Sequence, residues 1–169
     1  METMDCIRRR VAIRSFTKEP VPDSVMLKIL EAGRWAPSSK NSQPWHFIVV
    51  RERRTLESLS RLTTTGPHLA TAPVAIAVAT IGAKMPQTDA ARAIQNMVLV
   101  AWDLGVGTCW ITNFNQEEAK RLLNLPEEAV FITAMPFGYP DPSEARRKKR
   151  RKPLEEIVHW ERYGRKKPS

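Results

Sequence analysis

The stretch Ala36-Pro-Ser-Ser-Lys-Asn-Ser-Gln-Pro-Trp-His-Phe-Ile-Val-Val50 joins two different kinds of sequence at a proline. Its first half is a polar loop with hydroxyl and amide groups in a row, and the prolines limit its flexibility. Its second half, Trp45 to Val50, is aromatic and β-branched and predicts a strand. Such a loop is either a plain connection from a helix to a strand or the rim of a site for a heteroaromatic ring.

Helical patterns lie on both sides of this stretch. Asp23 is a good N-cap for a helix that ends at Ala36-Pro37, because the residue before a proline avoids the helical region. Asp89 is expected to cap a long amphipathic helix that stops at Gly105. The shorter expected helices are Met4 to about Val11, Thr55 to Leu62, and one from the capping-box-like pair Asn115 and Glu118 to near Leu123.

Short β-branched runs separate these helices. Val74–Thr80, Thr108–Ile111 and Val130–Ala134 predict three further strands. Because helices and strands alternate irregularly, the pattern indicates an α+β fold and not a regular βαβ winding. No internal repeat or low-complexity linker is visible, so we expect residues 1–169 to form a single domain.

The composition excludes several classes of protein. The chain has 169 residues, of which 42% are hydrophobic, as is typical of a globular domain. No apolar run approaches the roughly 20 residues of a membrane span, and no secretory signal is seen. The two cysteines, Cys6 and Cys109, have no metal-binding spacing. We therefore expect a cytoplasmic protein without a zinc site.

The familiar catalytic and nucleotide-binding motifs are absent from the sequence. No glycine-rich phosphate loop opens a helix after a strand. His46, His68 and His159 lie far apart along the chain, and each is expected to be structural or exposed. No pair of carboxylates suggests acid–base hydrolysis.

Basic residues are the most prominent remaining feature. The formal net charge is +9, which favours anionic ligands in general. Arg10 and Arg14 lie four residues apart around the end of a predicted helix, and a dense basic run follows at 149–152. Each feature alone is typical of solvated cations. The alternative is that some of these cations together hold a phosphate group.

Three stretches, in this order, resemble the nitroreductase family of FMN-dependent oxidoreductases. They are Ala36–Val50, Leu104-Gly-Val-Gly-Thr-Cys-Trp-Ile-Thr-Asn-Phe114 and Phe137-Gly-Tyr-Pro140, and the resemblance runs from about Ile7 to Trp160. It implies an α/β/α sandwich in which helices flank a central mixed or antiparallel sheet. It also implies an intertwined homodimer with FMN at the interface.

The resemblance implies a role for each part of the site. Arg10 would contact the FMN phosphate. Arg14 would lie near N1 and O2 of the ring, where a fixed cation stabilises the negative charge of the reduced form. Residues 37–41 would reach the same flavin from the other subunit, and a backbone N–H of 110–113 would point at N5. The implied FMN-binding residues are Arg10, Val11, Ala12, Arg14, Pro37, Ser38, Ser39, Asn41, Trp110, Thr112, Asn113, Lys149 and Arg151.

The implied reaction is ping-pong. NADH or NADPH gives hydride to the flavin and leaves, and a small acceptor such as a nitroaromatic or a quinone then takes two electrons. No side chain is expected to act as acid or base. Two alternatives stay open: another reaction within the same family, such as dehalogenation or heterocycle oxidation, and a basic nucleic-acid-binding protein, for which no RNA-binding motif is visible.

The chain departs from the family's pattern in three places. Val11 and Ala12 stand where the family often has a polar pair, which removes a neutral hydrogen bond worth about 1 kcal/mol. Thr112-Asn113 replaces a step that commonly contains glycine, and a Cβ there restricts close backbone approach. The connection from Ile81 to Asp89 is short, so we expect an open flavin face, and deiodination is less expected.

The C-terminal segment 146–169 is expected to be basic and to pack on the partner subunit. Its apolar residues need a surface to pack on, and they are Leu154, Ile157, Val158 and Trp160. The resemblance assigns no role to Arg146, Arg147 and Lys148.

Overall fold

A four-stranded sheet forms the centre of the computed structural model, which describes residues 1–144 and 149–167. The strand order is β1-β2-β4-β3, and every neighbouring pair is antiparallel, so the expected mixed or antiparallel sheet is antiparallel. The strands are β1 (Trp45–Val50), β2 (Val74–Thr80), β3 (Gly107–Thr108) and β4 (Val130–Gly138).

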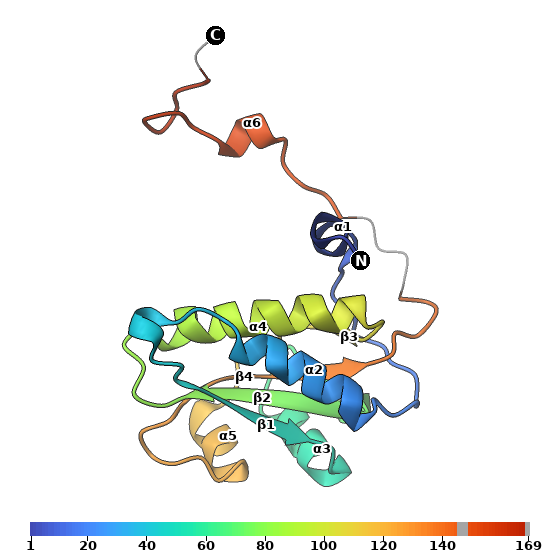
Figure 1. Cartoon of the computed structure of the whole chain (residues 1–169). Helices are drawn as coiled ribbons and strands as arrows, with labels where there is room; N and C mark the ends of the chain where they lie inside the picture. Colours follow the sequence, from blue (N-terminus) through green and yellow to red (C-terminus); the bar gives the residue numbers. More distant parts are fainter. Residues whose placement is uncertain (145–148, 168–169) are drawn as a thin grey trace.

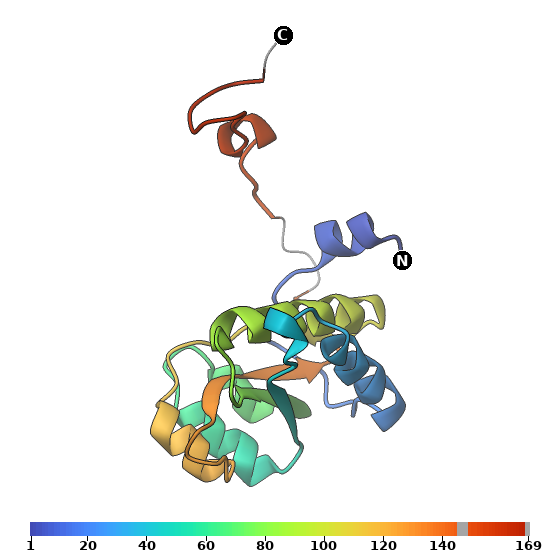
Figure 2. The same ribbon diagram turned by 60° about the vertical axis from the view of Figure 1, so that its left-hand side comes forward.

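Helices cover both faces of this sheet. α2 (Asp23–Arg34) and α4 (Pro86–Asp103) lie on one face, and α3 (Arg53–Arg61) and α5 (Gln116–Leu122) lie on the other (Figures 1 and 2). The expected α/β/α sandwich is therefore confirmed. The remaining short elements are α1 (Thr3–Arg9), η1 (Ser39–Asn41), η2 (Pro67–Thr71) and α6 (Leu154–Ile157).

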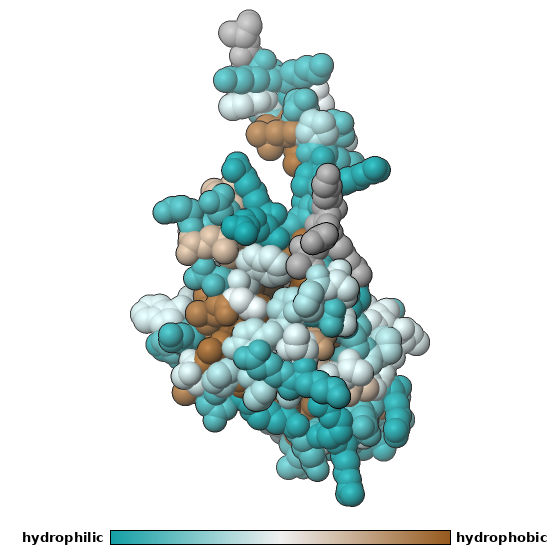
Figure 3. Space-filling model, turned by 90° about the vertical axis from the view of Figure 1, so that its right-hand side faces the viewer, coloured by the Kyte–Doolittle hydropathy of each residue, from teal (hydrophilic) through white to brown (hydrophobic). Residues whose placement is uncertain are grey.

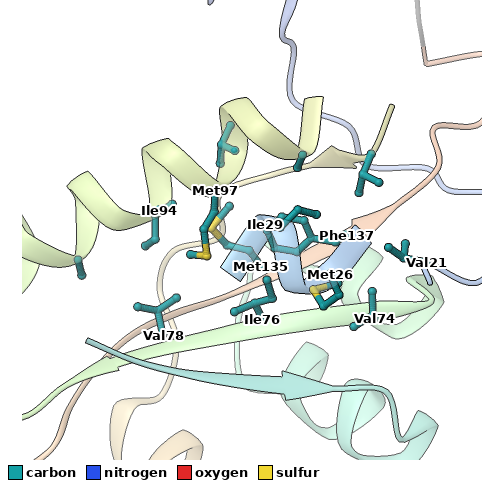
Figure 4. Packing of buried hydrophobic residues seen from close by; sticks show 14 residues of the cluster. Val21, Met26, Ile29, Val74, Ile76, Val78, Ile94, Met97, Met135 and Phe137 are labelled. Atoms are coloured by element: carbon teal, nitrogen blue, oxygen red, sulfur yellow. The ribbon is translucent and has the colours of Figure 1, made fainter. Parts of the chain in front are cut away.

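The central strand β2 shows why both faces are covered. All of its residues are buried, and their side chains alternate between two apolar clusters. Val74, Ile76 and Val78 face the cluster made with α2 and α4 (Figure 4), whereas Ala75 and Ala77 face the one made with α3 and α5. Successive side chains of a strand point to opposite faces, so a strand that is apolar throughout requires a layer on each side.

Two predicted helix caps differ from the structure, and two agree with it. Asp23 is the first residue of α2, after Pro22, and its carboxylate pairs with Arg51 at 2.8 Å instead of capping the helix. α4 already begins at Pro86, since proline suits the first turn, so Asp89 lies within that turn. Asn115 caps α5 as predicted by accepting the N–H of Glu118 at 3.3 Å. Gly105, with φ of 78°, follows the end of α4.

The predicted strand Thr108–Ile111 is shorter and lies earlier, at Gly107–Thr108. The chain leaves the ladder there because the buried Thr133 hydroxyl donates to the Ile111 carbonyl at 2.8 Å. β4 is longer than expected and continues to Gly138, since its end pairs with both β2 and β3. The first helix ends at Arg9 and not at Val11, because the chain becomes extended from that point.

Residues 149–167, which we call the arm, extend away from the rest of the molecule (Figures 1 and 3). Every residue from 150 to 167 is exposed, including Leu154 at 69% and Ile157 at 58%. Packing of the arm on a partner subunit stays a prediction. Arg146, Arg147 and Lys148 lie outside the described residues. Among the helices of the described residues, none is both long and apolar enough to cross a bilayer.

Candidate functional site

The segment from Arg10 to Phe16 is an extended chain bound to the ends of β3 and β4. The Ile13 N–H donates to the Thr108 carbonyl at 3.0 Å, and the Asp141 N–H donates to the Ser15 carbonyl at 3.0 Å. Val11 and Ile13 are buried. Because an extended chain alternates its side chains, Arg10 and Arg14 are directed away from that buried row.

Arg10, Lys149 and Arg151 form a group that we call the cation cluster. Burial, followed by the charges of Arg10 and Arg151, lowers the pKa of Lys149 below its ordinary value. The Lys149 ammonium donates to the Ile7 carbonyl at 2.8 Å, which joins the start of the arm to α1. No ion pair within residues 1–144 and 149–167 includes any member of the cluster. Three uncompensated cations fit a phosphate group, which supplies negative charge and three acceptor oxygens.

His68 on η2 is a neighbour of Arg14 that the sequence analysis treated as structural or exposed. The imidazole is buried, and its Nε2 has no hydrogen-bond partner in the described part of the chain. Burial, followed by the charge of Arg14, lowers the pKa of His68, while Glu144 acts in the opposite direction. No local sequence signal marks this histidine, because its proximity to Arg14 arises only from the folding of distant segments.

The segment Trp110–Asn113 is held by threonine hydroxyls. The Thr112 carbonyl accepts hydrogen bonds from Thr63 at 2.6 Å and from Thr65 at 2.8 Å. Asn113 has φ of 59°, in the left-handed region where glycine is favoured and asparagine is tolerated. Asn113 thus adopts a backbone conformation that glycine favours, and the restriction that its Cβ places on close approach stays a prediction. Trp110 is 43% exposed beside this turn.

The loop at 63–68 connects two parts of the predicted site. Thr65 binds the Thr112 peptide group, and His68, three residues later, lies beside Arg14. Gly66 lies between them against Ile111, and a Cβ on Gly66 would come within 2.8 Å of the Ile111 side chain. This loop links the segment at 110–113 to Arg14, and the charges of Arg10 and Arg151 act on Lys149.

The predicted loop at 37–43 adopts an unusual backbone. Lys40, Asn41 and Gln43 have φ values of 52°, 55° and 47°. Left-handed backbone costs a residue other than glycine about 1–2 kcal/mol, and such strain clusters at binding loops. The buried carboxylate of Asp89 accepts the Ser39 N–H at 3.1 Å, and the Ser38 hydroxyl accepts the Gln43 N–H at 2.8 Å. These bonds fix the loop against the first turn of α4.

The two halves of the predicted site lie at opposite ends of α4 within one chain (Figure 1). The bond between Ser39 and Asp89 places the loop at the start of the helix. At the other end, the Cys6 thiol donates to the Leu99 carbonyl at 3.3 Å, and the N-terminus pairs with Asp103 at 2.9 Å. α4 has 18 residues and is therefore about 27 Å long. One chain does not bring residues 37–41 to Arg10 and Arg14.

The connection between β2 and α4 contains no helix that could cover the site. The connection there is only Ile81–Met85, so the short connection expected from the sequence is confirmed. In the described ranges, no group of three or more histidine, cysteine, aspartate or glutamate residues could hold a metal ion.

Comparison with known proteins places this fold in a family. The model of the family described as "Nitroreductase family" matches residues 7–65 and 56–139. A Methanothermobacter thermautotrophicus protein, named provisionally as an NADH dehydrogenase/NAD(P)H nitroreductase, is 35% identical over 149 residues, which cover 83% of this chain and 78% of that protein. An iodotyrosine deiodinase of Thermotoga neapolitana is 26% identical over 163 residues and covers 81% of this chain and 88% of that protein.

A solved structure supports the same assignment. An FMN-dependent nitroreductase from Clostridium difficile R20291 superimposes with a TM-score of 0.87 and 27% identity, covering 95% of this chain and 99% of the other. The family match spans both the arginine segment and the turn at 110–113. The shared sequence, the antiparallel sheet and its covering helices lead to one conclusion: the chain belongs to the nitroreductase family.

Proposed function

We propose that this protein is an FMN-dependent oxidoreductase that transfers hydride from NADH or NADPH to a small acceptor such as a nitroaromatic or a quinone. The observation that carries the proposal is the cation cluster, which joins Arg10 near the start of the chain with Lys149 and Arg151 near its end, without an acidic partner among the described residues. The names of family relatives, which include an FMN-dependent nitroreductase, support the same chemistry.

The residues present suit the parts of FMN. Arg10, Lys149 and Arg151 would hold the phosphate by charge-assisted hydrogen bonds. Val11 and Ala12 carry no side-chain donor, so this stretch would contribute only its backbone. Arg14 would lie at the pyrimidine edge, where a fixed cation stabilises negative charge on the ring. When bound, the flavin supplies the two-electron chemistry, and the protein supplies binding, orientation and charge.

The turn at 110–113 offers hydrogen-bond donors for the ring. The carbonyls of Ile111 and Thr112 are occupied by threonine hydroxyls, and the Thr112 N–H donates to Thr65 at 3.2 Å. In the part of the chain that the structure describes, the N–H groups of Ile111 and Asn113 have no such partner. Ile111 is fully buried, so the N–H of the exposed Asn113 is the candidate for donation to the ring edge around N5, near Trp110, which is 43% exposed.

The complete site requires a second copy of the chain. The loop that carries Pro37, Ser38, Ser39 and Asn41 lies at the opposite end of α4 from the arginine segment, and α4 is about 27 Å long. A twofold axis across α4 would place this loop of one subunit beside Arg10 and Arg14 of the other, because a twofold contact is self-complementary. The exposed apolar side chains of the arm would then pack on the partner subunit.

The proposed site places few limits on the shape of the acceptor, because few elements of the chain cover it. The five-residue connection Ile81–Met85 leaves no covering helix above the site in the described residues. A reaction that needs the substrate to be enclosed, such as the deiodination named for the Thermotoga neapolitana relative, is therefore less suited to this chain. Water can supply the protons for the reduced acceptor.

An absorbance spectrum of the purified protein, followed by anaerobic titration with NADH and NADPH, tests the proposal. We expect the visible bands of an oxidised flavin and their bleaching by at least one nicotinamide. Assays with nitroaromatics, quinones and halogenated phenols then separate the proposed acceptors from other reactions of the family. A colourless protein that binds no added FMN would contradict the proposal, and steep salt-dependent DNA binding without flavin would favour the nucleic-acid alternative.

A further inference from the structure

The Thr112 peptide group is held by two hydroxyls from a loop 47 and 49 residues earlier in the chain. Thr63 Oγ1 donates to the Thr112 carbonyl at 2.6 Å, and Thr65 Oγ1 donates to the same oxygen at 2.8 Å. The Thr112 N–H donates back to Thr65 Oγ1 at 3.2 Å. Thr65 therefore binds both the donor and the acceptor of one residue. We call Thr63 and Thr65 the threonine clamp.

The clamp is itself ordered by the backbone. The Thr65 N–H donates to Thr63 Oγ1 at 3.1 Å, so each hydroxyl accepts one hydrogen bond and donates one. Beside it, the Asn115 N–H donates to the Leu62 carbonyl at 2.7 Å. Because each hydroxyl has a single proton, both protons are used on the Thr112 carbonyl. The two hydroxyl oxygens also lie 3.3 Å apart, and the shorter contacts at 2.6 and 2.8 Å favour donation to the Thr112 carbonyl over donation to each other.

The position of the clamp matters because the segment that it holds is exposed. Thr112 and Asn113 are both exposed, and Asn113 has a left-handed backbone. An exposed turn without side-chain bonds would sample several conformations, and ordering it during binding would weaken affinity. The clamp fixes the Thr112 carbonyl on the loop and leaves the Asn113 N–H without a partner in the described residues.

We propose that Thr63 and Thr65 are positioning residues that preform the ring-binding edge of the flavin site by fixing the peptide group of Thr112. This inference rests on the proposed function, because it assumes that the flavin ring lies against residues 110–113. The two threonines act on the cofactor through the backbone that they hold, whereas the cation cluster acts on its phosphate.

The test compares the double variant Thr63→Val, Thr65→Val with the matched control Thr64→Val. Valine keeps the branched shape of threonine and removes the hydroxyl, and Thr64 makes no side-chain bond among the described residues. We expect the double variant to bind FMN about tenfold more weakly in calorimetry, equivalent to about 1.4 kcal/mol. Its affinity for inorganic phosphate should stay at the wild-type value, because the cation cluster is unchanged.

Hydrogen exchange of the FMN-free protein supplies a readout that does not depend on activity. Amides of residues 110–114 should exchange about tenfold faster in the double variant than in Thr64→Val, while amides of β2 keep their protection. The conservative variant Thr65→Ser should restore both exchange and FMN affinity toward the wild-type values, since it retains the hydroxyl.

Three results would overturn the clamp. One is a double variant that matches Thr64→Val in FMN affinity and in exchange. Another is a parallel loss of affinity for FMN and phosphate with faster exchange throughout the chain, which would show general destabilisation. The third is a wild-type protein that binds no FMN. The measurement on the wild-type protein alone identifies this last result, so failure of the proposed function is distinguished from failure of the clamp.

Discussion

At the scale of single residues, the candidate site depends on the way in which an extended chain directs successive side chains to opposite sides. Val11 and Ile13 are buried, so Arg10 and Arg14 are left on the other side of the segment. The charge of Arg10 reaches Lys149, and the charge of Arg14 reaches His68. One short segment therefore contributes to two electrostatic environments, one around Lys149 and one around His68.

Charge reversal of Arg151 tests the cation cluster. Arg151→Glu should weaken FMN binding by about 2 kcal/mol, or roughly 30-fold, because it replaces a charge-assisted contact with a repulsive charge. Fluorescence titration of the FMN-free protein measures this change. Arg150→Glu is the matched control, since the neighbouring Arg150 is exposed and lies outside the cluster. Equal losses in both variants would show that the arm contributes only diffuse charge.

Protonation of His68 should destabilise the protein in mild acid. Burial, and then Arg14, lower the pKa of the folded-state imidazole below 6.5, so the unfolded state binds protons more readily just below that pH. The free energy of unfolding should therefore fall as pH drops from 6.5 toward the folded-state pKa. Urea unfolding at several pH values measures the slope. His68→Phe should reduce the slope.

At the scale of elements, β3 and the arginine segment are held in register by a close backbone contact. A Cβ on Gly107 would lie 2.6 Å from Cγ1 and 2.7 Å from Cβ of the fully buried Ile13. The same pairing carries the hydrogen bond from the Ile13 N–H to the Thr108 carbonyl. Glycine at 107 is thus required by the approach of the segment that carries Arg10 and Arg14.

Substitution of Gly107 should disturb this approach. Gly107→Ala is expected to lower the free energy of unfolding by about 1–3 kcal/mol through overpacking, and to weaken FMN binding as well. Chemical unfolding gives the stability change. In an Ile13→Ala background the added cost of Gly107→Ala should be smaller, because two of the three nearest atoms are removed. Additive costs in the double variant would rule out the contact as the cause.

At the scale of the whole molecule, α4 separates the two halves of the predicted site. The loop at 37–43 is bound to the start of α4, and α1 is bound to its last turns. A rigid helix of about 27 Å prevents the loop and the arginine segment of one chain from meeting. The arm adds exposed apolar side chains, among them Trp160, which is 40% exposed. No other part of the described chain buries them.

Mixed dimers test whether two chains share each site. In dimers that combine one Asn41→Ala chain with one Arg14→Ala chain, both substitutions should fall on the same flavin, which leaves the second site intact. Titration with FMN should then show one tight site per dimer. Two equally weakened sites would instead indicate that each chain binds its flavin alone.

Removal of the arm tests its role in assembly. A chain that ends at Lys152 keeps the cation cluster but lacks the apolar part of the arm, and it should lose dimer stability at micromolar concentration. Sedimentation velocity measures the association. Leu154→Asp with Ile157→Asp in the full chain provides a control in which only the apolar contacts are removed. Unchanged dimers in both proteins would contradict packing of the arm on the partner.

The sequence alone predicted the order of helices and strands, and its resemblance to the nitroreductase family implied the layered fold and the residues of the candidate site. Apolar side chains repeat every two residues in a strand and every 3.6 residues in a helix, and both periods follow from local geometry. The apolar strand β2, the helices and the cap at Asn115 could therefore be predicted. The arginines and the polar loop were identified by their resemblance to the nitroreductase family. The tertiary structure decided how these parts meet, including His68 beside Arg14 and the hydroxyls of Thr63 and Thr65 on Thr112. Contacts between residues far apart in the chain depend on packing in three dimensions, which no local pattern records.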